Sequence, residues 1–93
     1  MTDYRIFETD EFLRNVRDLD ARQKAFVAVK LTKYVYPQLR TRPQFGPNIK
    51  RLQGYRPTTW RYRIGRFQIF YGIDESNRIV NILALDDRKD AYR

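Results

Sequence analysis

The chain has 93 residues, 42% of them hydrophobic and 15% aromatic, which suits one small folded domain over residues 1–93. Lys and Arg outnumber Asp and Glu by 19 to 11, so the net charge is +8 and an anionic partner is expected. Cysteine and histidine are absent, which excludes disulfides, catalysis by thiol or imidazole, and metal sites built from those side chains. We expect no cofactor, no metal and, because no segment is typical of a membrane span or signal peptide, a cytoplasmic protein.

The positive charge is concentrated in the middle of the chain. No acidic residue occurs between Asp20 and Asp74, and this interval holds twelve basic residues: Arg22, Lys24, Lys30, Lys33, Arg40, Arg42, Lys50, Arg51, Arg56, Arg61, Arg63 and Arg66. The last six alternate with aromatic residues, as in grooves that combine phosphate contacts with base stacking. RNA is therefore the leading candidate partner. The alternatives are a solvated helix surface for the earlier charges and an acidic protein partner.

The first half of the chain predicts a strand followed by two helices. Residues 4–7 have the pattern of a short strand. Thr9 then predicts a helix start, because its hydroxyl can accept hydrogen bonds from free backbone N–H groups and apolar residues follow at helical spacing. A second apolar stripe predicts a longer helix over residues 21–40, so that the two helices form a hairpin. Proline and glycine in residues 42–47 end it.

The second half predicts strands. From Trp60, apolar residues alternate with Arg61 and Arg63, so the two arginines are expected on the face opposite the apolar side chains. Gly65-Arg66 predicts a tight turn into a second strand, which presents Gln68, Phe70 and Gly72 on the arginine face.

Residues 74–77 predict another turn, and the apolar run 79–85 predicts a strand buried on both faces. The fold class is therefore α+β: an N-terminal strand and a helical hairpin packed on a small antiparallel β-sheet.

The arginines of the first of these strands have the geometry of a phosphate-binding surface. Arg61 and Arg63 are expected about 6.8 Å apart, close to the spacing of successive phosphates in a nucleic-acid strand. The alternative is an edge strand protected from aggregation by its charges. Lys50-Arg51 is expected in a loop that brings both charges to the same side. Arg88 and Tyr92 either close this site from the tail or are a surface arginine and a packed tyrosine.

Four segments in this order carry a family pattern: Lys50 to Gly54, Trp60 to Gly65, Phe67 to Tyr71, and Arg88 to Arg93. Together they resemble the RelE/ParE superfamily toxins of type II toxin–antitoxin modules. The resemblance covers the C-terminal half by motif, and the whole chain by length and element order. It implies a RelE/ParE-like fold and a toxin that a cognate antitoxin holds inactive.

The resemblance leaves the target open. RelE-like members cleave mRNA, usually on the ribosome, by metal-free attack of the RNA's own 2′-hydroxyl on the adjacent phosphate. ParE-like members inhibit DNA gyrase and cleave nothing themselves. The leading expectation is an mRNA-cleaving endoribonuclease with mRNA and ribosome as partners. The alternatives are a gyrase inhibitor and a degenerate module that only binds its antitoxin.

The family pattern also assigns residues. It implies catalytic roles for Arg61, Arg63, Arg88 and Tyr92. It implies contacts with RNA or the ribosome for Lys50, Arg51, Arg66, Gln68 and Arg93. Gln68, however, stands where RNA-cleaving relatives commonly have an arginine, and Arg66 is the candidate to replace that arginine. Asp86 and Asp87 precede the tail where relatives often have Arg or His, and an acidic pair repels phosphate, so these departures favour the alternatives to cleavage.

Overall fold

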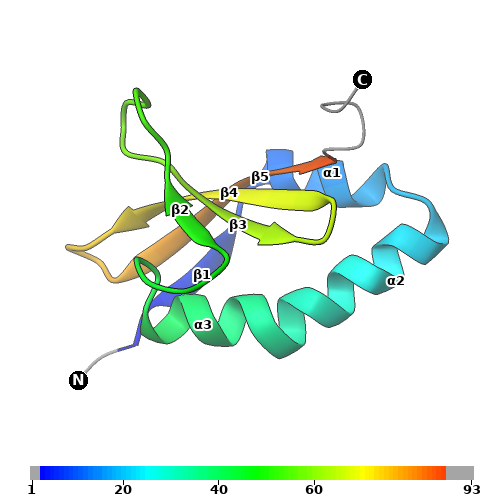
Figure 1. The fold of residues 1–93 in the computed structure, drawn as a ribbon, viewed down its shortest axis with the longest axis horizontal. Helices are drawn as coiled ribbons and strands as arrows, with labels where there is room; N and C mark the ends of the chain where they lie inside the picture. Colours follow the sequence, from blue (N-terminus) through cyan, green and yellow to red (C-terminus); the bar gives the residue numbers. More distant parts are fainter. Residues whose placement is uncertain (1–2, 88–93) are drawn as a thin grey trace.

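A computed structural model of the chain describes residues 3–87 (Figure 1). Within these residues, five strands form one sheet in the order β1-β5-β4-β3-β2. The strands are β1 (Arg5–Glu8), β2 (Ile49–Arg51), β3 (Trp60–Ile64), β4 (Phe67–Asp74) and β5 (Ile79–Asp87). The helices are α1 (Asp10–Arg17), α2 (Ala21–Lys30) and α3 (Tyr36–Thr41), with a π-helical turn at Leu31–Val35. The α+β class expected from the sequence is confirmed.

Side-chain caps begin the first two helices. The Thr9 hydroxyl oxygen accepts a hydrogen bond from the Phe12 N–H at 3.2 Å and donates one to the Ile82 carbonyl oxygen at 2.8 Å. The expected helix start is therefore confirmed, and the same side chain ties α1 to β5. The Asp20 carboxylate accepts from the Gln23 N–H at 2.8 Å, and the Gln23 side chain accepts from the Asp20 N–H at 3.3 Å. This reciprocal cap fixes the start of α2.

The second helix continues without a break from α2 through the π-helical turn into α3 (Figure 1). It covers the residues 21–40 expected from the sequence. In the wider turn, the Tyr36 N–H bonds to the Leu31 carbonyl five residues earlier. Pro37, which has no N–H to donate, then falls in the first turn of α3, where no donor is needed. The hydrogen-bond pattern of the long helix thus changes just before Pro37, and the helix can continue across the proline.

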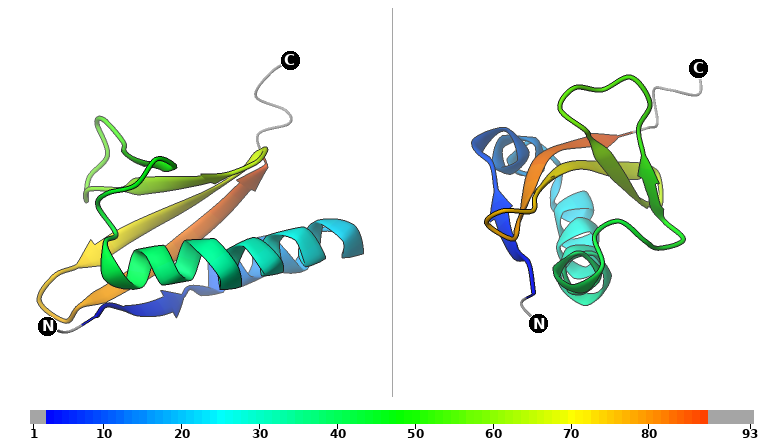
Figure 2. Two further views of the ribbon diagram at one scale, coloured as in Figure 1. Left: turned by 60° about the horizontal axis from the view of Figure 1, so that its bottom comes forward. Right: turned by 90° about the vertical axis from the view of Figure 1, so that its left-hand side faces the viewer.

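The helices pack on one face of the sheet (Figure 2). Strands β2 to β5 pair antiparallel, as expected, and β1 joins β5 in parallel. The turn between β3 and β4 consists of Gly65 and Arg66, and Gly65 has φ 61°, which glycine adopts without strain. We call the sheet face that the helices leave open the helix-free face.

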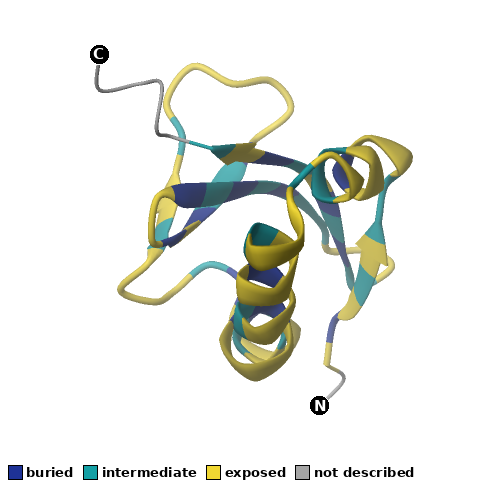
Figure 3. Ribbon diagram, turned by 90° about the vertical axis from the view of Figure 1, so that its right-hand side faces the viewer, coloured by how far each residue is buried: buried dark blue, intermediate teal, exposed yellow. Residues whose placement is uncertain are grey.

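The expectation that β5 is buried on both faces is wrong. Val80, Ile82 and Leu85 are buried beneath the helices, whereas Leu83 is 36% exposed. A shift in the register between β4 and β5 leaves Leu83 unpaired, as in a β-bulge. A single layer of helices covers one face of β5, and Figure 3 shows half-buried residues along the strands next to the buried ones. A continuous run of apolar residues in the sequence therefore does not show whether one or both faces of the strand are covered by other elements.

Candidate nucleic-acid interface

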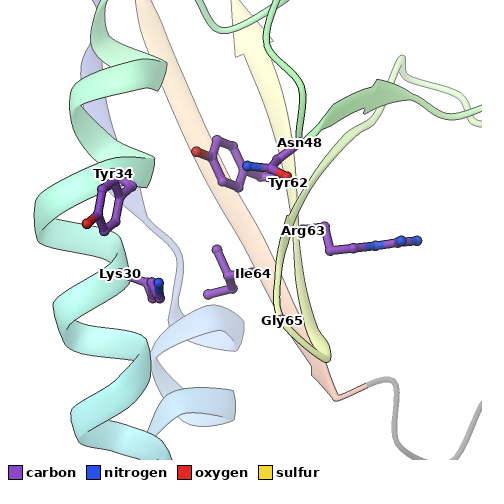
Figure 4. Close-up of a pocket in the computed structure, with 7 residues that line it drawn as sticks. All are labelled: Lys30, Tyr34, Asn48, Tyr62, Arg63, Ile64 and Gly65. Carbon is purple, nitrogen blue, oxygen red and sulfur yellow. The ribbon is translucent and has the colours of Figure 1, made fainter.

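The arginines of β3 lie on the helix-free face, as predicted. Tyr62 and Ile64 are buried on the opposite face, against the long helix. In the close-up of the hollow beside this helix, Arg63 points away from the helix while Tyr62 and Ile64 point toward it (Figure 4). Arg61 is half-buried and Arg63 is exposed. Strand alternation therefore places both guanidinium groups on one surface.

Lys50 and Arg51 do not lie in a loop, so that expectation is wrong. Both belong to β2, where Lys50 pairs with Arg61 and Arg51 with Trp60. Because successive residues of a strand point to opposite faces, Lys50 joins Arg61 on the helix-free face and Arg51 does not. The sequence gives little sign of this strand, since two of its three residues are charged.

Lys50 and Arg61 begin a row of directly opposite residues, which continues across β4 and β5 with Phe70 and Ala84; we call it the Lys50 row. Side chains directly opposite in antiparallel strands have Cβ atoms about 5 Å apart, and like charges there are destabilising. The Arg61 guanidinium donates to the Asn48 carbonyl oxygen at 3.3 Å, a contact that brings no negative charge. An anion bound between the two cations would relieve their repulsion.

The neighbouring row contains Arg63, Gln68 and Asp86, and we call it the Arg63 row. The Gln68 amide donates to the Asp86 carboxylate at 3.0 Å. Gln68 therefore lies on the helix-free face, as its place in the strand pattern predicts. The carboxylate beside it lowers the positive potential at this end of the surface.

Arg66 does not join Gln68 on the helix-free face. Its guanidinium forms an ion pair with Asp87 at 3.1 Å and lies 5.3 Å from the centre of the Phe67 ring. Phe67 is a buried residue of the core on the helix side. The remaining predicted site residues, Arg88, Tyr92 and Arg93, lie outside the described residues.

The sequence profile of the ParE toxins of type II toxin–antitoxin systems (parDE) matches residues 6–92. The chain belongs to this family. The predicted resemblance to RelE/ParE toxins is thereby confirmed, and the protein is a toxin of the type II class. A comparison with curated sequences finds no match.

Solved structures of the superfamily share the toxin's fold. The RelBE2 toxin–antitoxin complex from Mycobacterium tuberculosis matches with 26% identity over 95% of this chain and 94% of that chain, at a TM-score of 0.70. The archaeal RelE–RelB complex from Pyrococcus horikoshii matches with 19% identity over 96% and 98%, at 0.58. A mutant of the Escherichia coli toxin RelE in the free state matches with 15% identity over 99% and 90%, at 0.65. The last two support the fold alone.

Tyr71 of β4 is buried in the core, and Tyr36 of α3 is half-buried against it. Burial raises the pKa of Tyr71, whose hydroxyl donates to the Pro43 carbonyl at 2.7 Å. Burial, together with a hydrogen bond to Glu8 at 2.6 Å, raises the pKa of Tyr36. Both phenols therefore stay neutral and serve the core. Between residues 3 and 87, no cluster of three or more His, Cys, Asp or Glu is placed to hold a metal, and no helix is long and apolar enough to cross a membrane.

Proposed function

We propose that the toxin binds single-stranded mRNA on the helix-free face and cleaves it by attack of a 2′-hydroxyl on the adjacent phosphate. One observation carries the proposal: Lys50 and Arg61 lie directly opposite each other, with Arg63 one row away. Residues in neighbouring rows, such as Arg61 and Arg63, are two positions apart on a strand and therefore about 6.8 Å apart. This distance is close to the spacing of successive phosphates. The three cations are thus spaced to hold neighbouring phosphates.

The chemistry needs positive charge where negative charge develops. Attack by the 2′-hydroxyl gives the phosphate additional negative charge, which fixed cationic donors stabilise. In our proposal, Lys50 and Arg61 hold the phosphate that reacts, and Arg63 holds its neighbour. The family resemblance assigns a further phosphate contact to Arg88 and assigns base stacking or proton transfer to Tyr92. The toxin would act in the cytoplasm, where the ribosome presents mRNA.

A cognate antitoxin is the second proposed partner. RelBE2 and the archaeal RelE–RelB are complexes of a toxin with an antitoxin. On this toxin, the long helix exposes Phe26, Val29 and Tyr34, and the Lys30 ammonium lies 5.6 Å and 5.0 Å from the ring centres of Phe26 and Tyr34. Exposed apolar side chains next to a cation suit an amphipathic segment with acidic residues. Such an antitoxin would also offset the net charge of +8.

Inhibition of DNA gyrase without cleavage is the second candidate function. The hydrogen bond between Gln68 and Asp86 favours it, because a neutral amide and a carboxylate occupy the place of a catalytic arginine. The family profile that matches is also named for ParE toxins. In this alternative, the cations of the Lys50 row would contact an acidic protein surface.

The deciding experiment is induced expression of the toxin alone, followed by mapping of new RNA 5′ ends. We expect growth arrest with new ends inside coding regions, and the loss of both effects in Arg61→Ala. Arg17→Ala removes the same charge from an exposed position on α1 and should behave as wild type. Arrest without new ends, together with inhibited supercoiling by purified gyrase, would reject cleavage in favour of the second candidate. Absence of arrest would reject both and leave a module that only binds its antitoxin.

A further inference from the structure

Gly72 lies within β4 on the helix-free face, directly opposite Asn81 of β5. Its backbone does not have the positive φ that favours glycine, and a Cβ atom added to it would have no neighbouring atom within 4 Å. Neither backbone strain nor close packing in the monomer therefore requires glycine here. Glycine inside a strand commonly marks a bulge or a site where another molecule approaches the backbone, and Gly72 itself is in regular register with Asn81, beyond the bulge. The missing side chain keeps a space open above the sheet.

This space is a hollow of about 260 Å³. The loop before β3, which rises from the sheet away from the helices, forms one wall (Figures 1 and 2). Strands β4 and β5 and the residue that caps α1 form the rest. The lining residues are Thr9, Pro57, Thr58, Gly72, Ile73, Asp74, Asn81 and Leu83. The bulge in β5 brings Leu83 to the hollow, which therefore has both apolar and hydrogen-bonding walls.

Asn81 provides a hydrogen-bonding group that has no partner among residues 3–87. The residue is half-buried, and its side-chain amide forms no hydrogen bond with any residue of the described chain. A ligand that enters the hollow can form a hydrogen bond with this half-buried amide. The amide offers a donor and an acceptor side by side. This is the pairing that the edges of unstacked nucleobases in single-stranded RNA present.

We propose that the hollow above Gly72 is a nucleobase subsite, which rests on the proposed binding of RNA to the same face. Gly72 is two residues from Phe70, so the hollow lies about 6.8 Å along the strand from the Lys50 row. That distance corresponds to about one nucleotide. Across the sheet, the hollow on β4 and β5 lies about two strand spacings, or ~10 Å, from the two cations on β3 and β2. An RNA strand whose phosphate is held by Lys50 and Arg61 can therefore place the base of a neighbouring nucleotide in the hollow.

Two aromatic residues occupy sheet positions near this subsite on the same face. Phe70 occupies the Lys50 row, and Phe7, which is 57% exposed, lies opposite Asn81 on β1. Aromatic side chains on an open sheet serve as stacking surfaces for successive bases.

The rim of the hollow favours a base over a phosphate. Asp74 lines it, and its two carboxylate oxygens accept hydrogen bonds from the backbone and the side chain of Asn77 at 3.1 and 2.9 Å. These hydrogen bonds lower the pKa of Asp74, so it carries its negative charge at neutral pH. A carboxylate repels phosphate but accepts hydrogen bonds from the exocyclic amines of bases. The phosphates therefore belong to the Lys50 row and the base to the hollow.

The test fills the hollow without touching the cations. Gly72→Val adds a side chain that the backbone accepts, and a β-branched residue suits a strand. Asn81→Ala removes the amide without adding bulk. Thr32→Val is the matched control, because it adds an apolar group at an exposed position on the long helix. Thermal unfolding and circular dichroism establish that each variant is folded.

The probes are single-stranded oligonucleotides of A, C, G or U with methylated 2′-hydroxyls, which cannot be cleaved, and inorganic polyphosphate, which has no bases. We expect wild type to prefer one base, Gly72→Val to bind RNA about tenfold more weakly, and Asn81→Ala to lose the base preference. Polyphosphate should bind all variants equally.

The outcomes separate the two proposals. Equal RNA affinity and base preference in wild type and Gly72→Val would overturn the subsite and leave the proposed function standing. A Gly72→Val variant that keeps RNA binding but loses antitoxin binding would also overturn it, since the hollow would then receive an antitoxin side chain. Failure of wild type to bind any RNA would reject the proposed function itself, and the subsite with it.

Discussion

The Gln68 amide donates a 3.0 Å hydrogen bond to the Asp86 carboxylate, and Arg63 lies directly opposite Gln68 on β3. The Arg63 row therefore combines one positive charge with one negative charge, whereas the Lys50 row has two positive charges and no acidic residue. An approaching polyanion meets an uneven surface. Its phosphates are attracted to the Lys50 row more strongly than to the Arg63 row.

Asp86→Asn should raise the affinity of the toxin for single-stranded RNA about two- to fivefold at low salt. The substitution removes the charge but keeps an oxygen that accepts from Gln68, so the local geometry is retained. The gain should shrink as salt is added, because screening weakens the repulsion that the variant removes. Fluorescence anisotropy with an uncleavable oligonucleotide measures it. Asp18→Asn, an exposed change at the end of α1, should leave the affinity unchanged, and an unchanged affinity in Asp86→Asn would contradict the prediction.

Lys50→Gln should stabilise the fold while weakening RNA binding. Lys50 and Arg61 are directly opposite in an antiparallel pair, so removing one charge should raise the free energy of unfolding by about 0.2–1 kcal/mol. The same change removes a phosphate contact. Urea denaturation gives the first quantity and RNA titration the second. Lys33→Gln, at an exposed position in the π-helical turn, tests whether any loss of positive charge has this effect. A less stable Lys50→Gln variant would show that Lys50 is retained for structure.

Local signals predict the face of the sheet that carries the candidate site. The alternation from Trp60 to Ile64 places Arg61 and Arg63 opposite the core, and Gly65 sets the turn that brings Gln68 beside Arg63. These features depend on residues that are close in the sequence. Pattern and turn chemistry are therefore sufficient to locate them.

The unpredicted features depend on contacts between distant residues. Strand β1 pairs with β5 across more than seventy residues of the chain, as in the register of Arg5 with Ile79. Strand β2 has only three residues and is defined by its pairing with β3. The hollow above Gly72 forms because the loop before β3 and the bulge at Leu83 lie next to each other in the fold. These segments are distant in the sequence, so no local pattern predicts that they are neighbours.

Thr9→Ala should lower the free energy of unfolding by about 1–2 kcal/mol. The variant loses the cap on the Phe12 N–H and the hydrogen bond to the Ile82 carbonyl, so both the start of α1 and its attachment to β5 are weakened. For a domain of this size, each kcal/mol corresponds to about 4–8 °C in Tm. Thr32→Ala, an exposed change in the π-helical turn, serves as control. Equal Tm values for the two variants would show that the cap contributes nothing measurable.

Tyr71 should make the fold sensitive to alkaline pH. Burial raises its pKa above the ordinary value of 10.0, so the folded chain keeps this proton at pH values where the unfolded chain loses it. The resulting contribution to stability is complete below about pH 10 and is lost as the pH rises through the raised pKa. Tyr36, whose pKa is raised in the same direction, adds to the loss.

Tyr71→Phe should therefore be less stable than wild type at pH 7, by about 1–2 kcal/mol, because the Pro43 carbonyl loses its donor. Above pH 10 its stability should fall less steeply than that of wild type, because one titrating group has been removed. Urea denaturation at intervals between pH 7 and 11 measures both effects. Tyr55→Phe, at a position that is 55% exposed, should follow the wild-type curve. Parallel curves for Tyr71→Phe and wild type above pH 10 would show that the buried phenol does not control alkaline unfolding.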